Sequence, residues 1–241
     1  MAGHDDPSAA RGRRAVVFSG GDPPPRSVVA VLVGRLPDGA VVIGADSGAE
    51  HARALGLTVD VAVGDFDSID PSVLTAIEAG GAAILRHPPD KDATDLELAL
   101  DTAMTLEIDT VTVVGGHGGR VDHFLANCLL LGSERYRALS LDAFVGSAHV
   151  VVVRDRARIG GHRGDVLTLL AVGGEARGIR TQGLRFPLDG AILQPGSTLG
   201  VSNEMVAESA TVSVDHGTVL AIRPHALEPD PAPSSPDDGE A

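Results

Sequence analysis

Two acidic segments of the sequence have residue types and spacings that suit metal-dependent phosphate chemistry. One is Gly64–Ser68 (GDFDS), which directly follows the apolar run Val59–Val63, and the other is Lys91–Asp95 (KDATD). Carboxylates clustered at the end of a strand repel each other unless a cation lies between them. Mg²⁺ is commonly shared between one or two carboxylates and the phosphates of a substrate. We therefore expect a divalent cation and phosphate chemistry at this place.

A glycine-rich segment, Gly115–His123 (GGHGGRVDH), leads into an apolar helix. Backbone N–H groups at such a turn form an anion site, and Arg120 could act as a charge-assisted clamp on phosphate. The segment matches neither the dinucleotide fingerprint nor a P-loop, because the third glycine and the Gly-Lys-Ser/Thr are missing. His123 and Asn127 share a face of the helix, whereas Asp122 could simply offset its dipole. The competing interpretation is a tight structural turn.

Lys91 is the only lysine among 19 lysine and arginine residues. A codon bias that replaces lysine by arginine wherever either works would explain the other eighteen. The exception lies inside the acidic motif, and lysine differs from arginine in geometry and in how readily it loses a proton. We therefore expect Lys91 to have a function there, with chance or local solvation as the alternative.

The elements that must position these residues alternate between strands and helices. Capping signals begin helices at Ser47–Glu50 and Thr94–Glu97, and Asp70 with Pro71 begins a third. Such alternation predicts an α/β region in three layers, with a mostly parallel sheet covered by helices on both faces. The strands that we predict are Ala15–Phe18, Val41–Ala45, Val59–Val63, Ala82–Leu85 and Thr110–Val114.

The polar residues of interest follow three of these strands. Asp46 follows one, Asp65 and Asp67 follow the next, and the glycine segment from Gly115 follows another. Ligands of open α/β sheets bind outside the carboxyl ends of the strands. We therefore expect these residues to meet at one edge of the sheet.

After about Arg158 the pattern changes to short runs, such as Val166–Val172, Thr211–Val214 and Val219–Ile222, separated by turn residues. Period-two alternation without a helical period predicts a smaller all-β sandwich. The expected organisation is a disordered tail (1–13), an α/β domain (14–157), the β-sandwich (158–223) and a second disordered tail (224–241), which is rich in Pro, Asp and Ser.

The composition narrows the possible partners and compartment. A net charge of −14 argues against nucleic acid and against an anionic membrane as partners. A single cysteine, Cys128, excludes a disulfide framework and fits a reducing compartment, so we expect a cytoplasmic protein. No apolar stretch has the length of a membrane span, and the first residues do not resemble a signal peptide.

An Asp-x-Asp after a strand also occurs in the haloacid-dehalogenase phosphatases, which use the first Asp as a nucleophile. That family usually has Thr or Val at the fifth position, where this chain has Ile69. Its motif also comes early in the fold, and its later acidic pair is not evident here. It is a distant alternative.

Five segments in order resemble the thiamine pyrophosphokinase (thiamine diphosphokinase) family over about residues 15 to 223. The resemblance implies an α/β catalytic domain, a C-terminal β-sandwich that helps bind thiamine, and a homodimer with sites at the subunit interface. It implies transfer of the pyrophosphoryl group of ATP to the thiamine hydroxyl, giving thiamine diphosphate and AMP, with Mg²⁺ as cofactor. The segments are Ala45–Ala49, Val63–Ile69, Lys91–Ala99, Gly115–His123 with Asn127, and Val201–Glu204.

The resemblance also implies roles for individual residues. Ser202 and Asn203 would face thiamine across the dimer, and the metal ligands would be Asp46, Asp65, Asp67 and Asp95. The ATP-binding set would be Ser47, Gly48, Thr94, Gly116, Gly118, Gly119, Arg120, Asp122, His123 and Asn127.

Attack on the β-phosphorus needs charge neutralisation and an aligned hydroxyl more than covalent chemistry from the protein. Arg120 and Lys91 could add positive charge, and either Asp67 or Asp92 could accept the hydroxyl proton. The chain departs from some relatives in having no Trp to stack on thiamine, and in having Ser47 where many have Gly.

Two other functions remain open at this point. One is a different Mg²⁺-dependent phosphotransferase or phosphatase on the same scaffold, which would release phosphate rather than AMP. The other is a non-catalytic module that binds a nucleotide or thiamine, which would have no need for four acids facing a metal.

Overall fold

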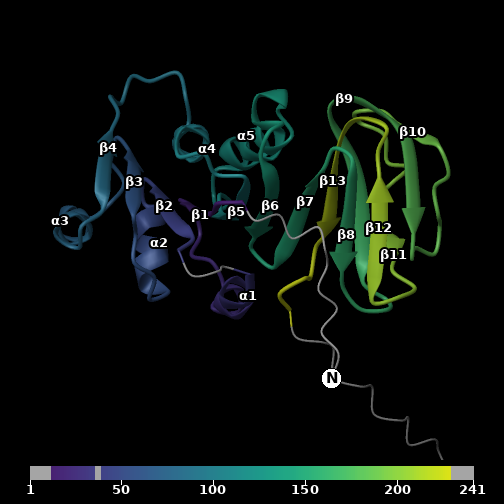
Figure 1. The fold of residues 1–241 in the computed structure, drawn as a ribbon, viewed down its shortest axis with the longest axis horizontal. Helices are drawn as coiled ribbons and strands as arrows, with labels where there is room; N and C mark the ends of the chain where they lie inside the picture. Colours follow the sequence, from purple (N-terminus) through teal and green to yellow (C-terminus); the bar gives the residue numbers. More distant parts are fainter. Residues whose placement is uncertain (1–11, 36–38, 229–241) are drawn as a thin grey trace, which may run out of the picture.

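The computed structural model describes residues 12–35 and 39–228 (Figure 1). It confirms the predicted class: an N-terminal α/β region is followed by an antiparallel β region. Of the predicted tails, residues 1–11 and 229–241 lie outside the described residues.

Six parallel strands form the α/β sheet, in the order β4-β3-β2-β1-β5-β6. Each predicted strand is present within two residues of its expected ends, and β6 is an addition. The bounds are β1 (Arg14–Ser19), β2 (Val41–Ala45), β3 (Val61–Gly64), β4 (Ala83–Arg86), β5 (Thr110–Gly115) and β6 (Ser140–Val145).

The strand order reverses between β1 and β5. From β1 the chain proceeds outward to β2, β3 and β4, and it then returns to place β5 on the other side of β1. The loops after β1 and β5 therefore leave the sheet in divergent directions and open a crevice at their carboxyl ends. This reversal determines where a ligand can enter.

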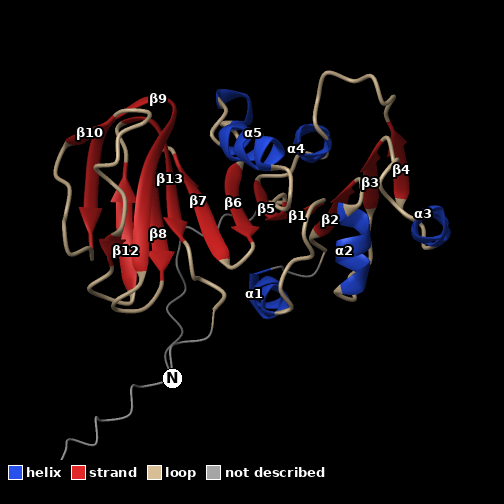
Figure 2. Cartoon of the chain, turned by 180° about the vertical axis from the view of Figure 1, so that it is seen from behind, coloured by secondary structure: helices blue, strands red, loops and turns tan. Residues whose placement is uncertain are grey.

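Helices cover both faces of this sheet (Figure 2). Side chains of β1 alternate between them: Ala15 and Val17 belong to the core under α4 and α5, whereas Val16 and Phe18 belong to the core under α1, α2 and α3. This alternation is the period-two rule of a strand buried on both sides. The helices are α1 (Ser27–Arg35), α2 (Gly48–Ala54), α3 (Pro71–Ala79), α4 (Asp95–Thr105) and α5 (Val121–Leu131), with a short 3₁₀ helix, η1 (Glu134–Tyr136).

Two of the three predicted helix caps are present, and one is wrong. The Asp70 side chain accepts a hydrogen bond from the Ser72 backbone N–H, and Thr94 accepts one from Glu97 at 3.2 Å. Ser47, in contrast, has helical backbone angles (φ −59°, ψ −13°) and makes no side-chain capping bond. A capping side chain needs an extended residue at this position, so the predicted capping box at Ser47 does not form.

A hairpin continues the parallel sheet into the β region. β6 pairs antiparallel with β7 (Ala148–Val153), β7 with β13 (His216–Arg223), and β13 with β9 (Val166–Gln182). Within the described residues, thirteen strands thus belong to one hydrogen-bonded sheet. The expected domain boundary near residue 158 stays a prediction. The two regions are joined by continuous strand pairing from β6 through β7 and β13 to β9.

The long strand β9 organises the β region. Its first half pairs with β13, and its second half pairs with β10 (Ala191–Leu193) and β12 (Ser209–Ser213). The region therefore folds over its own apolar core, which includes Leu167, Ile179 and Met205. The remaining strands are β8 (Arg156–Gly160), paired with β12, and β11 (Asn203–Glu204), paired with the start of β9.

Residues 224–228, which the predicted C-terminal tail includes, are fixed against the β6–β7 turn. The Leu227 backbone N–H donates to Ser147 O, and the Ser147 hydroxyl donates to Pro224 O. Leu227 also packs against the core under α1–α3, which explains why the chain stays ordered beyond β13. Among the helices that the structure describes, none is long and apolar enough to cross a membrane.

Candidate functional site

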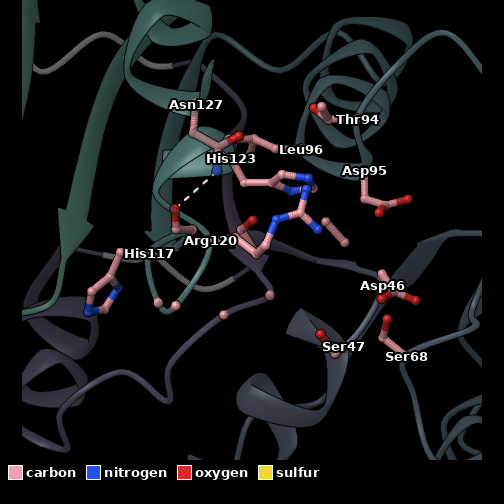
Figure 3. A pocket seen from close by; sticks show the side chains of 17 residues that line it. Asp46, Ser47, Ser68, Thr94, Asp95, Leu96, His117, Arg120, His123 and Asn127 are labelled. Atoms are coloured by element: carbon pink, nitrogen blue, oxygen red, sulfur yellow. Dashed lines mark hydrogen bonds between the residues drawn. The ribbon is translucent and has the colours of Figure 1, made fainter. Parts of the chain in front are cut away.

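A polar cavity of about 320 Å³ opens at the carboxyl ends of β1, β2 and β5, at the reversal of strand order. Figure 3 shows Asp46, Ser47 and Ser68 on one side and Arg120, His123 and Asn127 on the other. The lining residues are Ser19, Gly20, Gly21, Ala45, Asp46, Ser47, Ser68, Thr94, Asp95, Leu96, Gly116, His117, Gly118, Gly119, Arg120, His123 and Asn127.

Three carboxylates converge beside this cavity. Asp46 follows β2, and Asp65 and Asp67 follow β3; one oxygen of each lies within 4.8 Å of the others. Between the two β3 acids, the Phe66 ring is buried in the core under α1–α3, with the Arg86 guanidinium 5.2 Å from its centre. The buried ring anchors the loop, so that the flanking carboxylates are held together outside the sheet.

Asp46 has the electrostatics of a cation ligand. Its side chain is only 7% exposed, and its Oδ1 has no hydrogen-bond partner among the described residues. Burial raises the pKa of Asp46; a backbone hydrogen bond from Ser47 opposes this, and the charges of Asp95, Asp65 and Asp67 add to it. A buried carboxylate oxygen without a donor, next to like charges, needs a positive partner. The residues present therefore fit a divalent cation bound by oxygen ligands.

Lys91 connects the fourth acid to this cluster. Its Nζ donates to Asp65 Oδ2 at 2.9 Å and to Asp95 Oδ1 at 2.6 Å. The hydrogen bond from Lys91 is the main cause of a lowered pKa at Asp65. Burial acts to lower the pKa of Lys91, but the two carboxylates outweigh it and raise that pKa. Asp95, at the first position of α4, is thus tied to the β3 loop through the only lysine of the chain.

The glycine segment forms the opposite wall, held by a second loop. Gly116 N–H donates to Gly20 O, and Asp22 N–H donates to His117 O. Gly116 has a φ of +77°, and a Cβ there would lie 3.1 Å from Asn127 Nδ2, which itself donates to Gly116 O at 3.0 Å. Only glycine suits this combination of left-handed backbone and close approach. Asn127 on α5 thereby fixes the loop that lines this side of the cavity.

Arg120 lines the cavity, but its guanidinium forms a bidentate ion pair with Asp122, at 2.9 and 2.7 Å. Both side chains are well exposed, at 70% and 65%. The pair lowers the pKa of Asp122 and raises that of Arg120. Asp122 itself does not line the cavity, and its ion pair with Arg120 connects it to the cavity wall.

The other predicted site residues divide into those that the cavity gathers and those that it does not. Ser47, Thr94, Gly116, Gly118, Gly119, His123 and Asn127 line it. Gly48 is instead a packing position, because a Cβ there would lie 2.1 Å from Phe18 O, so glycine lets α2 approach β1. Asp92 is exposed and lies outside the three-carboxylate group.

The two residues predicted to face thiamine lie in the β region, at the other end of the molecule from β3 (Figure 1). Ser202 is exposed and has a φ of 57°. The Asn203 amide is occupied within the chain: its Oδ1 accepts from Phe186 N–H, and its Nδ2 donates to Phe186 O at 2.7 Å. Asn203 thus holds the loop that carries Phe186, whose side chain is 64% exposed.

Seven residues of the cavity wall were not among the predicted site residues: Ser19, Gly20, Gly21, Ala45, Ser68, Leu96 and His117. Ser19 ends β1 and Gly20 and Gly21 follow it, whereas Ser68 donates its hydroxyl to Asp67 Oδ1 at 2.8 Å. A signal was present: Ser-Gly-Gly-Asp directly after an apolar strand is itself a glycine turn at a strand end. The sequence does not show that β1 and β5 are neighbours in the sheet. This pairing brings the glycine turn after β1 and the glycine turn after β5 into one wall of the cavity.

Comparisons with known proteins agree on one family. The family model for the catalytic domain of thiamin pyrophosphokinase matches residues 36–141, and the model for its vitamin B1 binding domain matches residues 149–219. Thiamine pyrophosphokinase from Bacillus subtilis (strain 168) is 29% identical over 203 residues, which are 83% of this chain and 94% of that protein.

Solved structures agree with these matches. A crystal structure of thiamine pyrophosphokinase from Bacillus subtilis superposes with a TM-score of 0.75 at 27% identity, covering 88% of this chain and 98% of that one. The enzyme from Candida albicans has the same fold, with a TM-score of 0.71 at 16% identity, over 87% of this chain and 89% of its own. Both domain models match, and they match in the same order as the α/β region and the β region of this structure. The chain therefore belongs to the thiamine pyrophosphokinase family.

Proposed function

We propose that this protein transfers the pyrophosphoryl group of ATP to the hydroxyl of thiamine, giving thiamine diphosphate and AMP, with Mg²⁺ bound by Asp46, Asp65, Asp67 and Asp95. The observation that carries the proposal is the pairing of two features across one cavity. A carboxylate cluster around a buried, unpartnered Asp46 oxygen faces a glycine loop at the start of α5. That arrangement suits a polyphosphate held between cations and backbone N–H groups.

The residues of the two walls have distinct tasks. The loop His117–Gly119 and the first turn of α5 would present N–H groups to phosphate oxygens, and Arg120 on the same loop would add a charge-assisted contact once it leaves Asp122. When bound, the divalent cation would neutralise negative charge on the phosphates. Positioning and charge stabilisation of this kind account for most of the catalysis of phosphoryl transfer.

Two carboxylates are candidates for accepting the proton of the attacking hydroxyl. Asp67 belongs to the carboxylate cluster, and its basicity would fall when a cation binds there. Asp92 is exposed and outside the cluster. Asp67→Asn should therefore weaken cation binding as well as turnover, whereas an effect of Asp92→Asn on turnover alone would identify Asp92 as the base.

The thiamine site that we propose lies in the β region, around Ser202 and Phe186. Without a tryptophan, the chain still offers an exposed aromatic ring at Phe186, held in place by Asn203. The neighbouring Arg185 guanidinium, 5.7 Å from the ring centre, is neutralised by Glu204 at 2.9 Å. A ring with a compensated cation beside it can stack on a positively charged heterocycle.

A homodimer would bring this site to the carboxylates of a second chain, because one chain keeps them at opposite ends. Exposed apolar side chains support such an interface: Val121, Leu125 and Leu129 form a stripe along α5, at 65%, 55% and 63% exposure. Leu125→Glu should convert the dimer to monomers in light scattering. Met104→Glu, on an exposed position of α4, is the matched control that should leave the mass unchanged. A Leu125→Glu protein that remains dimeric would remove α5 from the interface.

The function is tested by a product assay with purified protein, ATP, Mg²⁺ and thiamine, followed by chromatography of nucleotides and thiamine esters. We expect AMP in step with thiamine diphosphate, and only when thiamine is present. ADP with thiamine monophosphate would refute the pyrophosphoryl mechanism, and phosphate without a thiamine ester would indicate a phosphatase. The single cysteine fits the cytoplasm as the place of this reaction.

A further inference from the structure

We propose that Lys91 is an exchangeable counter-cation: its ammonium holds Asp65 and Asp95 while the divalent cation is absent, and it releases them when the cation binds. The released ammonium would then be available to a phosphate of the substrate. This second step rests on the proposed function, whereas the exchange itself involves only the protein and the metal.

The geometry places Lys91 in competition with a metal. Its ammonium contacts one oxygen from each of two predicted metal ligands, Asp65 Oδ2 and Asp95 Oδ1. Mg²⁺ binds carboxylate oxygens at about 2.1 Å and demands nearly octahedral geometry. A cation that reaches these two oxygens at that distance therefore meets the ammonium at the same atoms. The ammonium must then move, unless the metal binds each carboxylate through its other oxygen, of which Asp65 Oδ1 already accepts the Asp67 backbone N–H at 3.3 Å.

The charges show that Lys91 neutralises the carboxylate cluster only in part. One positive charge compensates two carboxylates. Among the residues that the structure describes, Asp46 keeps an unpartnered buried oxygen and the Asp67 carboxylate accepts only the Ser68 hydroxyl. Asp46, Asp65 and Asp67 nevertheless lie within 4.8 Å of one another. A divalent cation attracted by the uncompensated pair would thus approach Asp65 and repel the ammonium.

Lysine suits this exchange better than arginine. Its ammonium is a compact charge with three donors on a flexible stem, whereas guanidinium is a rigid fork that pairs bidentately with one carboxylate. Lys91 also lies in the loop between β4 and α4, where its side chain can turn without disturbing a helix or strand. These properties give a reason for the one lysine in a chain that otherwise uses arginine.

The same uniqueness supplies the test, because an amine-reactive acylating reagent can modify only Lys91 and the N-terminal amine. In wild-type protein with EDTA we expect slow acylation of Lys91, whose side chain is 12% exposed and doubly paired. Adding Mg²⁺, without nucleotide, should accelerate acylation several-fold, measured by mass spectrometry of the peptide that carries Lys91. An unchanged or slower rate with Mg²⁺ would overturn the exchange.

Asp67→Asn is the matched control for this experiment. Asp67 belongs to the carboxylate cluster, but among the described residues it forms no ion pair or hydrogen bond with Lys91. The variant should keep the slow basal acylation and lose the acceleration by Mg²⁺. Acceleration that persists in Asp67→Asn would show that Mg²⁺ acts elsewhere, and it would also refute the proposal.

A second measurement uses Lys91→Gln and titration calorimetry with Mg²⁺ alone. Removing the positive charge that competes for the carboxylate oxygens should tighten Mg²⁺ binding about tenfold. Weaker or unchanged binding would mean that Lys91 supports the metal site instead of competing for it. Because neither measurement contains ATP or thiamine, their failure is distinguishable from a negative product assay, which would refute the proposed reaction alone.

Discussion

Replacing Asp46 by asparagine should make the protein more stable without divalent cations and less able to bind them. The substitution is nearly isosteric, and Asp46 has a left-handed backbone, with a φ of 49°, which asparagine tolerates well. The change therefore removes a charge from a buried position without straining the turn between β2 and α2.

The magnitude follows from the distances in the cluster. Lys91 compensates Asp65, so the uncompensated neighbour of Asp46 is Asp67, with oxygens within 4.8 Å. Two unit charges at that separation repel by about 0.9 kcal/mol even at the dielectric constant of water. Salt screens them only partly, because the Debye length at 0.1 M is about 10 Å. Since burial adds to this cost, we expect a gain of about 1–2 kcal/mol in the free energy of unfolding.

The pH dependence has a definite sign. Burial raises the pKa of Asp46 in the folded protein, so ionising this group above its unfolded pKa costs folding free energy. The stabilisation by Asp46→Asn should be present at neutral pH. It should vanish below about pH 4, where the carboxyl group is neutral in both states.

Urea unfolding in EDTA and in Mg²⁺ tests this reasoning. Wild-type protein should gain stability with Mg²⁺ through ligand binding to the folded state, and Asp46→Asn should gain much less. Asp189→Asn, at a fully exposed side chain, should respond to Mg²⁺ as the wild type does. An Asp46→Asn protein that is less stable than wild type in EDTA would refute the claim that this carboxylate lacks a favourable partner.

Three further outcomes are expected. Gly116→Ala should weaken ATP binding about tenfold, because a left-handed alanine costs about 1–3 kcal/mol and its Cβ crowds Asn127. Gly160→Ala in β8, where a Cβ meets nothing within 4 Å, should not weaken it, and equal losses in both would contradict the loop geometry. The Ser72 hydroxyl and backbone N–H lower the pKa of Asp70, so this cap stabilises the protein above the unfolded-state pKa of Asp70 and loses its effect as the pH falls through the folded-state pKa. Asp70→Ser should abolish that pH dependence of the melting temperature. An unchanged pH profile would refute this role of the cap. Phe186→Ala should raise the KM for thiamine but not for ATP, and equal changes in both would remove Phe186 from the thiamine site.

The sequence predicted the site better than it predicted the strand order. Asp46, Asp65 and the glycine segment could be placed at one edge because each follows an apolar run, and parallel strands end at the same edge. The sequence carries no comparable local signal for the order of strands. The pairing of β1 with β5 joins segments far apart in the sequence. Because this pairing could not be predicted, neither could the position of Gly20 in the cavity wall.

Tertiary contacts decided the local structure at two other places. The run Ser27–Arg35 is rich in β-branched residues, yet it forms α1, because Val28 and Leu32 fill the core beside Phe18. Ser47 has the sequence of a capping residue, but the close approach of Gly48 to β1 sets a helical backbone before the helix begins. In both cases packing outweighs a preference of a few tenths of a kcal/mol to about one.

The unbroken ladder from β6 through β7 and β13 to β9 limits how this protein can adapt to its substrates. Many enzymes shield a reacting phosphate by closing two domains about a hinge. Here such a swing would have to break backbone hydrogen bonds between neighbouring strands. Shielding from water must then come from small rearrangements of the Ser19–Asp22 and Gly115–Arg120 turns. Turnover should accordingly depend on how fast these short turns reorganise, and crosslinking the two regions should slow it little.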